Sequence, residues 1–218
     1  YIFTDSNLGK KQILESYKCS SKKIFILPYT IPSYLNKNKS RKFNKKLPKK
    51  FLFYPAQFWQ HKNHINLLHA FKKIEKNKIK DLHLVFTGTK NQFYDEILDE
   101  VKKLNISNKV IFLDRVQDIF MRDLYKKSLA TIFVSSLGPT NIPPLEAISV
   151  GSPLICSNVY AMKEQLKDAA VYVDPKNSSS IYRAILMVYK NKSLRKRLII
   201  KGRNLSKSKD KNIFNKNF

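Results

Sequence analysis

The sequence predicts an α/β fold in which helices cover both faces of a Rossmann-like parallel sheet. Apolar runs of strand length alternate with helical patterns over about 150 residues. The runs are apolar at successive positions, which is typical of strands that are buried on both faces. Strands that alternate with helices become parallel neighbours joined by right-handed crossovers.

The first 35 residues are predicted to form the end of a strand, a helix and a second strand. Residues 1–3 are typical of a strand end, and Asp5 and Ser6 are interpreted as the cap of a helix that runs to Tyr17. Residues 23–28, KIFILP, then predict a short buried strand. Because the chain opens without methionine and inside a strand pattern, we expect it to begin within a larger protein.

From residue 51 onward, strands and helices alternate. The predicted strands are 51–56, 82–88, 109–113, 129–135, 153–157 and 170–174. The predicted helices are 62–77, 93–104, 118–128, one from about residue 143, 161–168, 178–191 and 193–208. Ligands of such sheets bind beyond the carboxyl ends of the strands, so chemistry is expected in the loops that follow them. In the helix at 62–77, Ile65, Leu68, Phe71 and Ile74 are expected to share the buried face.

The net charge of +26 invites a nucleic-acid function, but the residue types do not favour it. Arginine, whose planar fork suits nucleic-acid sites, supplies only seven of the 42 basic residues. Lysine dominates beside abundant asparagine and isoleucine, as expected of a low-GC genome at neutral surface positions. We therefore expect no nucleic-acid partner, while peripheral contact with an anionic membrane at its inner face stays open as an alternative.

The basic residues gather in two segments. Residues 36–50 carry eight basic residues and no acidic one, and are predicted to form a solvated linker. The stretch from residue 183 to 218 carries twelve basic residues against one acidic residue. Its last part, 206–218, is interpreted as a basic tail, which leaves 51–205 as the main domain.

The remaining composition favours a cytoplasmic globular protein. No run of 18 apolar residues occurs, so no transmembrane helix is predicted. Cys19 and Cys156 lie far apart and match no metal or redox spacing, which suggests a reducing compartment. His61 and His64 could share a helical edge, but no third ligand lies near them in sequence, so no metal site is expected.

Residues 137–158, LGPTNIPPLEAISVGSPLICSN, are unusual in a chain with five glycines. Neither G-x-G-x-x-G nor G-x-x-x-x-G-K-[ST] occurs, so no dinucleotide fingerprint or P-loop is predicted. Pro143 and Pro144 suit the first turn of a helix, whose free N–H groups favour an anion such as phosphate. Glu146, one turn inside, could accept two hydroxyl groups of a ribose or could complement the helix dipole; physics alone leaves both open.

Part of this stretch, PPLEAISVGSPLICSN, resembles the PPLEAMACGTPVVASN signature of the family 4, or group 1, glycosyltransferases. Further similar segments follow in the family's order: YPAQFWQHKNHINLLHAF, LVFTG, KVIFLDRV, LYKKSLATIFVSS and AVYVDP. The resemblance implies that residues 51–205 are the nucleotide-sugar-binding, C-terminal half of a GT-B fold. Residues 1–35, which are more weakly similar, would be a remnant of the N-terminal acceptor domain.

The resemblance implies roles for individual positions. Glu146 matches the glutamate that holds the donor ribose, and Lys62 matches the lysine that pairs with the diphosphate; these are the predicted catalytic residues. Asn141 and Ile142 match positions whose backbone N–H groups meet the diphosphate and the sugar. The predicted donor-binding residues are Gln57, Lys62, Asn63, Gly88, Arg115, Val116, Gly138, Thr140, Asn141, Ile142 and Glu146.

Three of these positions need a comment. Arg115 and Val116 match the loop near the nucleobase, where base contacts in the family are mostly made by the backbone. Gly88 ends a strand at the same mouth, and a simple tight turn is an equal interpretation.

The sequence departs from the family's pattern at two positions. Gly138 stands where the family has the first glutamate of its Glu–seven residues–Glu motif, which contacts the transferred sugar. Gln57 stands where the family commonly has an arginine. The side chains of Thr140 and Asn141 are hypothesised to take over part of the sugar contact.

The function that the resemblance implies is transfer of a sugar, with retention, from a nucleoside-diphosphate sugar to a glycan or lipid-linked acceptor hydroxyl, without a metal or other cofactor. The family's acceptor domain, with its glycine-rich loop and active-site histidine, is not in this sequence, so the chain is expected to be the donor-binding half of the catalyst. Two alternatives stay open: a non-catalytic nucleotide-sugar-binding module, and a GT-B sugar-nucleotide epimerase.

Overall fold

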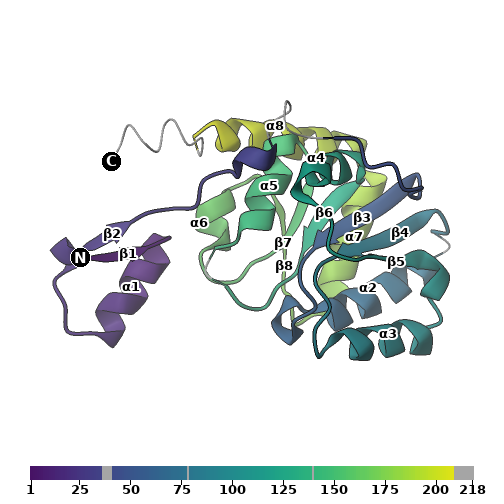
Figure 1. Ribbon diagram of the computed structural model, residues 1–218, viewed down its shortest axis with the longest axis horizontal. Coiled ribbons are helices and arrows are strands. Elements are labelled where there is room, and N and C mark those ends of the chain that lie inside the picture. The colour runs from purple at the N-terminus through teal and green to yellow at the C-terminus, as the bar shows by residue number, and fades with distance from the viewer. Residues whose placement is uncertain (36–40, 78, 139, 209–218) are drawn as a thin grey trace.

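The computed structural model describes residues 1–35, 41–77, 79–138 and 140–208, which form a small and a large unit (Figure 1). The small unit contains β1 (Ile2–Thr4), α1 (Asn7–Ser16), the 3₁₀ helix η1 (Ser21–Lys23) and β2 (Ile24–Ile26). β1 and β2 are parallel, with Ile2 opposite Ile24. Ser6 caps α1 by accepting a 3.1 Å hydrogen bond from the N–H of Gly9, which confirms the predicted cap.

The second strand of the small unit is not buried as the sequence predicts. Ile24 is buried, but Phe25 is 41% exposed, and its ring lies beside those of Tyr1 and Phe3, which are exposed as well. The reason is that the described residues contribute only two strands to this sheet. Apolar residues that point away from α1 therefore have no second layer to pack against.

The large unit is built on a six-stranded parallel sheet of order β5-β4-β3-β6-β7-β8, which confirms the predicted fold class. The strands are β3 (Lys50–Pro55), β4 (Leu82–Thr87), β5 (Val110–Leu113), β6 (Ala130–Phe133), β7 (Leu154–Ser157) and β8 (Val171–Val173). The strand order reverses between β3 and β6, where Phe53 lies opposite Thr131. Such a reversal opens a crevice at the carboxyl ends of the strands.

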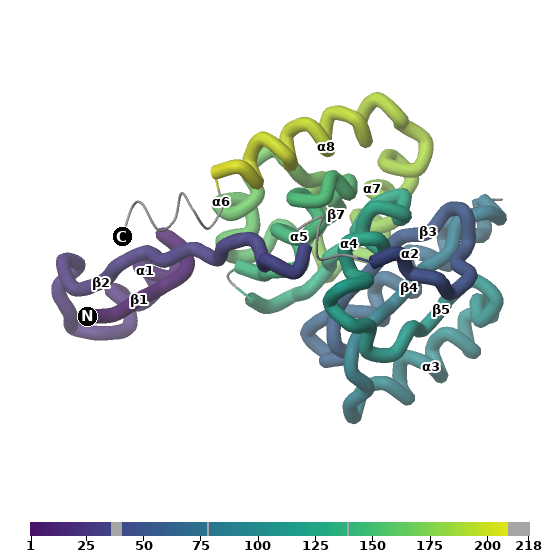
Figure 2. The backbone as a smooth tube through the Cα atoms, turned by 45° about the horizontal axis from the view of Figure 1, so that its top comes forward, coloured from purple at the N-terminus to yellow at the C-terminus, as the bar shows by residue number. Residues whose placement is uncertain are grey.

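Helices cover both faces of this sheet (Figures 1 and 2). One face carries α2, α3 and α7, and the other carries α4, α5 and α8. Their bounds are α2 (His64–Lys76), α3 (Tyr94–Lys103), α4 (Asp118–Lys127), α5 (Ile142–Val150), α6 (Met162–Leu166), α7 (Ser178–Lys190) and α8 (Lys192–Lys207). The 3₁₀ helices η2 (Ser33–Leu35), η4 (Gln60–Lys62) and η5 (Ser107–Lys109) lie in the connections.

The predicted buried face of α2 is right in three of its four positions. Leu68, Phe71 and Ile74 are buried, whereas Ile65 is only partly buried and Leu67 takes its place in the core. The helix begins at His64 because residues 60–62 turn as η4. Burial of each such large side chain contributes about 1.5–3 kcal/mol, so α2 is held mainly by its contact with the sheet.

The connection between the two units is less solvated than its charge suggests. Residues 36–40 of the predicted linker lie outside the described residues. Phe43, however, is buried, and its ring packs edge-on against Phe120 of α4 with the centroids 6.0 Å apart. Its N–H donates a 2.8 Å hydrogen bond to Asp123. Figure 2 shows the segment that leaves β2 running toward α5.

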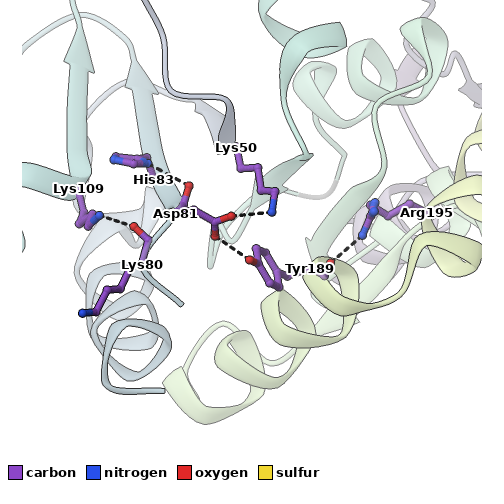
Figure 3. Close-up of polar contacts among 7 residues, drawn as sticks. All are labelled: Lys50, Lys80, Asp81, His83, Lys109, Tyr189 and Arg195. Atoms are coloured by element: carbon purple, nitrogen blue, oxygen red, sulfur yellow. Dashed lines mark hydrogen bonds and ion pairs between the residues drawn. The ribbon is translucent and has the colours of Figure 1, made fainter. Parts of the chain in front are cut away.

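The amino-terminal edge of the sheet is fastened by exposed polar contacts (Figure 3). Asp81, just before β4, accepts 2.6 Å hydrogen bonds from Lys50 at the start of β3 and from the hydroxyl of Tyr189 on α7. The hydrogen bond from Lys50 and then that from Tyr189 lower the pKa of Asp81. Because solvent screens exposed pairs, this cluster adds little to stability.

Among the residues that the structure describes, no helix is both long and apolar enough to cross a membrane. The last part of the predicted basic tail, residues 209–218, lies outside those residues, and α8 continues to Lys207.

Replacement of Gly88 by alanine is expected to destabilise the protein. The new Cβ would lie 2.3 Å from the carbonyl oxygen of Ala56, a backbone atom, so the ends of β3 and β4 would have to separate. Overpacking of this kind costs about 1–3 kcal/mol, which urea unfolding measures. The exposed neighbour provides a control: Thr89→Ala should stay within about 0.5 kcal/mol of wild type. An unchanged unfolding midpoint for Gly88→Ala would contradict the close approach.

Candidate functional site

Two cavities adjoin at the carboxyl ends of the central strands. One, of about 310 Å³, contains Glu146 and is called the Glu146 cavity; the other, of about 460 Å³, contains Lys62 and is called the Lys62 cavity. The Glu146 cavity is lined by Tyr34, Pro55, Ala56, Gln57, Thr87, Gly88, Thr89, Arg115, Val116, Asp118, Met121, Ile142, Pro143 and Glu146. The Lys62 cavity is lined by Pro55, Ala56, Gln57, Trp59, His61, Lys62, Phe133 and Pro143.

The two cavities bring together seven of the eleven predicted donor-binding residues. They are Gln57, Lys62, Gly88, Arg115, Val116, Ile142 and Glu146. These residues follow β3, β4 and β5 or begin α5, and the two cavities share Pro143 and the loop after β3. They thus lie at the crevice where the strand order reverses, the place at which open α/β sheets bind ligands.

The first turn of α5 forms part of the wall between the two cavities. Asn141 is extended at the N-cap, with φ −147°, and prolines occupy the first turn as predicted. Gly138 has φ +108°, a left-handed conformation that disfavours any side chain. Ile142 and Pro143 line the cavities, so the positive end of the helix dipole faces the site.

The backbone N–H of Asn141 is engaged within the fold. It donates a 3.1 Å hydrogen bond to Oε1 of Gln165 on α6, and Nε2 of Gln165 donates a 3.0 Å bond to the carbonyl of Asn141. The sequence predicts that this N–H meets a diphosphate. In the structure, a ligand can accept from the N–H of Asn141 only if the hydrogen bond from this N–H to Gln165 breaks.

Glu146 is a buried carboxylate, with 3% of its surface exposed, and it lies between two phenols. The hydroxyl of Tyr34 on η2 donates to Oε1, and the hydroxyl of Tyr125 on α4 donates to Oε2. Burial raises the pKa of Glu146, the hydrogen bonds from Tyr125 and Tyr34 oppose that rise, and the charge of Asp118 adds to it. The sequence predicts a carboxylate open to ribose hydroxyls, and it does not predict that either tyrosine contacts Glu146.

Lys62 presents an unshared cation to the Lys62 cavity. Its Nζ lies 5.3 Å from the centre of the Phe133 ring, and burial lowers the pKa of its ammonium group. The carbonyl of Lys62 accepts a 2.6 Å hydrogen bond from Tyr54, which fixes the backbone of η4. No carboxylate among the described residues lies within ion-pair distance of Lys62. A bound anion would supply the missing counter-charge.

Asn63 and His64 serve the fold rather than either cavity. Asn63 has φ 63°, and its Nδ2 donates to the carbonyls of Val134 at 3.0 Å and Pro175 at 2.7 Å. The side chain predicted to bind the donor therefore points into the protein. His64 is stacked on Tyr54 with ring centroids 4.8 Å apart, and burial lowers its pKa to about 3.

Thr140 faces the small unit instead of the two cavities. Its hydroxyl donates to Oδ2 of Asp5, the residue before the cap of α1. Glu164 on α6 accepts from the N–H groups of Asn7 at 2.8 Å and Leu8 at 3.3 Å, so a carboxylate complements the amino end of α1. Asp5, interpreted from the sequence as part of a cap, thus contacts Thr140 directly, and both residues line a third cavity of about 190 Å³.

In the part of the chain that the structure describes, no three His, Cys, Asp or Glu side chains come together as metal ligands.

Residues 36–205 match the family described as glycosyl transferases group 1. The match covers most of the chain, and the chain belongs to this family.

Two curated relatives are similar to the chain. It is 28% identical over 185 residues to the O-antigen chain mannosyltransferase RfbU of Salmonella typhimurium, covering 85% of this chain and 50% of the relative. It is 27% identical over 148 residues to the O-antigen chain mannosyltransferase B of Escherichia coli, covering 68% of this chain and 38% of the relative. The chain therefore spans half or less of the length of these two relatives.

Solved structures confirm the fold class, the C-terminal half of a GT-B fold. A glycosyltransferase from Rickettsia africae ESF-5 superposes with a TM-score of 0.85 at 19% identity, covering 99% of this chain and 61% of the other. Anabaena HepE, crystallised with UDP and glucose, superposes with a TM-score of 0.82 at 13% identity, covering 99% and 60%.

Replacement of Glu146 by glutamine is expected to change how stability depends on pH. Because the pKa of Glu146 is raised in the folded state, its contribution to stability is fully present below its unfolded pKa and is lost as pH rises through the raised value. Glu146→Gln removes this titration. The free energy of unfolding of the variant minus that of wild type should therefore increase as pH rises from about 4 to neutrality.

Urea unfolding at a series of pH values measures this difference. Ser149→Ala is the matched control on the same helix, because serine does not titrate in this range, and its difference from wild type should stay flat. A flat difference for Glu146→Gln as well would show that the carboxyl is not held in the described environment.

Proposed function

We propose that this chain is the donor-binding half of a retaining glycosyltransferase, which moves a sugar from a nucleoside-diphosphate sugar to a hydroxyl of a glycan or lipid-linked acceptor. The observation that carries the proposal is the pairing of Lys62 and Glu146 in adjoining cavities beside the first turn of α5. A cation and a helix amino end suit a diphosphate, and a carboxylate suits the ribose hydroxyls next to it.

The donor is proposed to lie across both cavities. Its diphosphate occupies the Lys62 cavity beside Ile142 and Pro143, and its ribose reaches Glu146. The nucleobase then extends along Arg115, Val116 and Gly88, which line the far part of the Glu146 cavity. The donated sugar projects toward Thr140 and Asn141, where Asp5 contacts Thr140.

The chemistry proposed for this half of the enzyme is positioning and charge stabilisation. The bond between the anomeric carbon and the diphosphate oxygen breaks, and the diphosphate keeps the electron pair. Lys62 and the dipole of α5 stabilise that growing negative charge, and we propose no metal cofactor for this role. An acceptor oxygen bonds to the anomeric carbon and passes its proton to the departing diphosphate, while Glu146 keeps the donor in place through the ribose.

The comparisons support the reaction class and leave the substrates as proposals. The Salmonella and E. coli relatives are named mannosyltransferases, and HepE was crystallised with UDP and glucose. The relatives are longer than this chain, so a transfer reaction is proposed for a protein that includes an acceptor-binding part.

A cytoplasmic location with peripheral contact at an anionic membrane is part of the proposal. It is supported by exposed basic side chains on α8, namely Lys192, Lys196, Arg197, Arg203 and Lys207. Such basic side chains are attracted to anionic lipid headgroups. An acceptor carried on a lipid would then lie close to the donor site.

A second candidate is a module that binds a nucleotide sugar without transferring the sugar. It is favoured by Gly138, which brings no acid to the sugar end of the site, and by the engagement of the Asn141 N–H with Gln165. The two candidates differ in turnover. A transferase that includes this chain releases nucleoside diphosphate from a donor in the presence of acceptor, whereas a binding module releases none.

Replacement of Lys62 by alanine is expected to weaken the binding of a nucleoside diphosphate by about 10- to 150-fold. This range corresponds to the loss of a hydrogen bond to a charged group. Binding of the matching nucleoside, which has no phosphate, should not change. Calorimetric titration of the chain with UDP, GDP and ADP and with uridine, guanosine and adenosine measures both.

Lys90 provides the control, because it lies near the same edge but pairs with Asp114 at 3.0 Å. Lys90→Ala should bind each nucleotide as wild type does. If wild type and Lys62→Ala bind the nucleoside diphosphate with equal affinity, the proposed position of the diphosphate in the Lys62 cavity is wrong.

A further inference from the structure

The two phenols that hold Glu146 differ in how firmly they are built into the protein. Tyr125 is fully buried on α4, where its ring packs edge-on against Phe53 with centroids 5.1 Å apart. Tyr34 is only partly buried, belongs to the short η2, and lines the Glu146 cavity. Tyr125 is therefore a fixed partner of the carboxylate, whereas Tyr34 is a wall of the cavity that faces the space a ligand would fill.

The hydroxyl of Tyr34 makes the contact that a sugar hydroxyl would make. It is an O–H group that donates to Oε1 of a buried carboxylate, from the cavity side. A ribose hydroxyl bound to Glu146 needs the same acceptor and the same approach. Because a buried carboxylate is costly to leave without donors, the hydroxyl of Tyr34 also keeps Glu146 satisfied when no ligand is present.

We propose that Tyr34 occupies the ribose position on Glu146 in the ligand-free protein, and that nucleotide binding displaces its hydroxyl while Tyr125 stays in place. The inference rests on the proposed function, since it takes the ligand to be a nucleoside diphosphate. It makes Tyr34 a further residue of the site, one that competes with the ribose hydroxyls and sets how tightly they are held.

The surrounding contacts allow the ring of Tyr34 to move without unfolding its neighbours. Leu35, the next residue, is buried, and its carbonyl accepts a 2.8 Å hydrogen bond from Arg122 of α4. This bond and the buried Leu35 side chain anchor the backbone immediately after Tyr34. Rotation of the Tyr34 side chain about its own Cα–Cβ bond breaks the contact with Glu146 and leaves the anchor intact.

Tyr34→Phe is the test, because it removes the competing hydroxyl and keeps the ring. Calorimetry compares wild type and variant for UDP, GDP and ADP, and for the 2′,3′-dideoxy form of whichever nucleotide binds. The variant should bind the ribonucleotide about 2- to 10-fold more tightly, the gain expected when one net hydrogen bond no longer has to be broken. The dideoxynucleotide should bind both proteins equally, since it has no hydroxyl to place on Glu146.

Two further variants serve as controls. Tyr17→Phe changes an exposed tyrosine of the small unit and should leave every affinity unchanged. Tyr125→Phe removes a donor that remains in place in both states, so it should not tighten binding of the ribonucleotide.

The outcomes separate this inference from the proposed function. If Tyr34→Phe binds the ribonucleotide more weakly, the Tyr34 hydroxyl contacts the ligand. If it binds the ribonucleotide as wild type does, the hydroxyl is never displaced. Either result overturns the inference. Equal tightening for the ribo and dideoxy forms would mean that the cavity has merely loosened, and overturns it too. If the inference is overturned in one of these ways but Glu146→Gln weakens nucleotide binding, the proposed donor site remains supported. Failure of wild type and variant to bind any of the three nucleotides would overturn both.

A direct measurement follows the ring itself. With 3-fluorotyrosine in the protein and the Tyr34→Phe variant used to assign its signal, ¹⁹F NMR should show the Tyr34 resonance shifting on addition of the ribonucleotide. The dideoxynucleotide should leave that resonance nearly unchanged. A Tyr34 signal that stays in place while the ribonucleotide saturates the site would rule out the displacement.

Discussion

The carboxylate of Glu146, buried at the crevice of the sheet, is the group on which the arrangement of the site depends. A charge in such a place is costly, and the protein meets the cost with two phenol donors from segments far apart in sequence. Tyr125 comes from α4, and Tyr34 comes from the segment that joins the two units. One interaction therefore ties together α4, α5 and the connection to the small unit.

α4 links these parts because it contacts both Glu146 and the connecting segment. Its inner face supplies Tyr125, and its other contacts secure the connecting segment through Arg122 to Leu35 and Asp123 to Phe43. The connection is highly basic, yet Phe43 and Leu35 dock it on the helix as firmly as core residues. The position of Tyr34 against Glu146 follows from this docking.

The site combines two electrostatic environments within adjoining cavities. Burial raises the pKa of Glu146 and lowers that of Lys62, so the charged form of each group is less stable than it would be in water. A ligand that brings hydroxyl groups to one and negative charge to the other relieves both. At the amino end of α5, Gln165 already accepts from the backbone N–H of Asn141, and Asp5 of the small unit accepts from the hydroxyl of Thr140.

The sequence by itself determined the parallel sheet, the order of its elements and seven of the residues that line the two cavities. Apolar strands, proline in the first turn of α5 and glycine at position 138 are local signals, and a parallel sheet brings the ends of its strands to one edge whatever the details.

Tertiary structure alone decided the partners of the polar groups. Tyr34 and Tyr125 lie 112 and 21 residues from Glu146, and no local pattern marks a tyrosine as a donor to a distant carboxylate. The same holds for Asn63, whose amide satisfies two distant carbonyls, and for Phe25, whose exposure follows from the number of strands beside it. Hydrogen bonds and burial between remote segments arise only when the chain has packed, because both depend on what lies across the interface and not on the residues next to them in sequence.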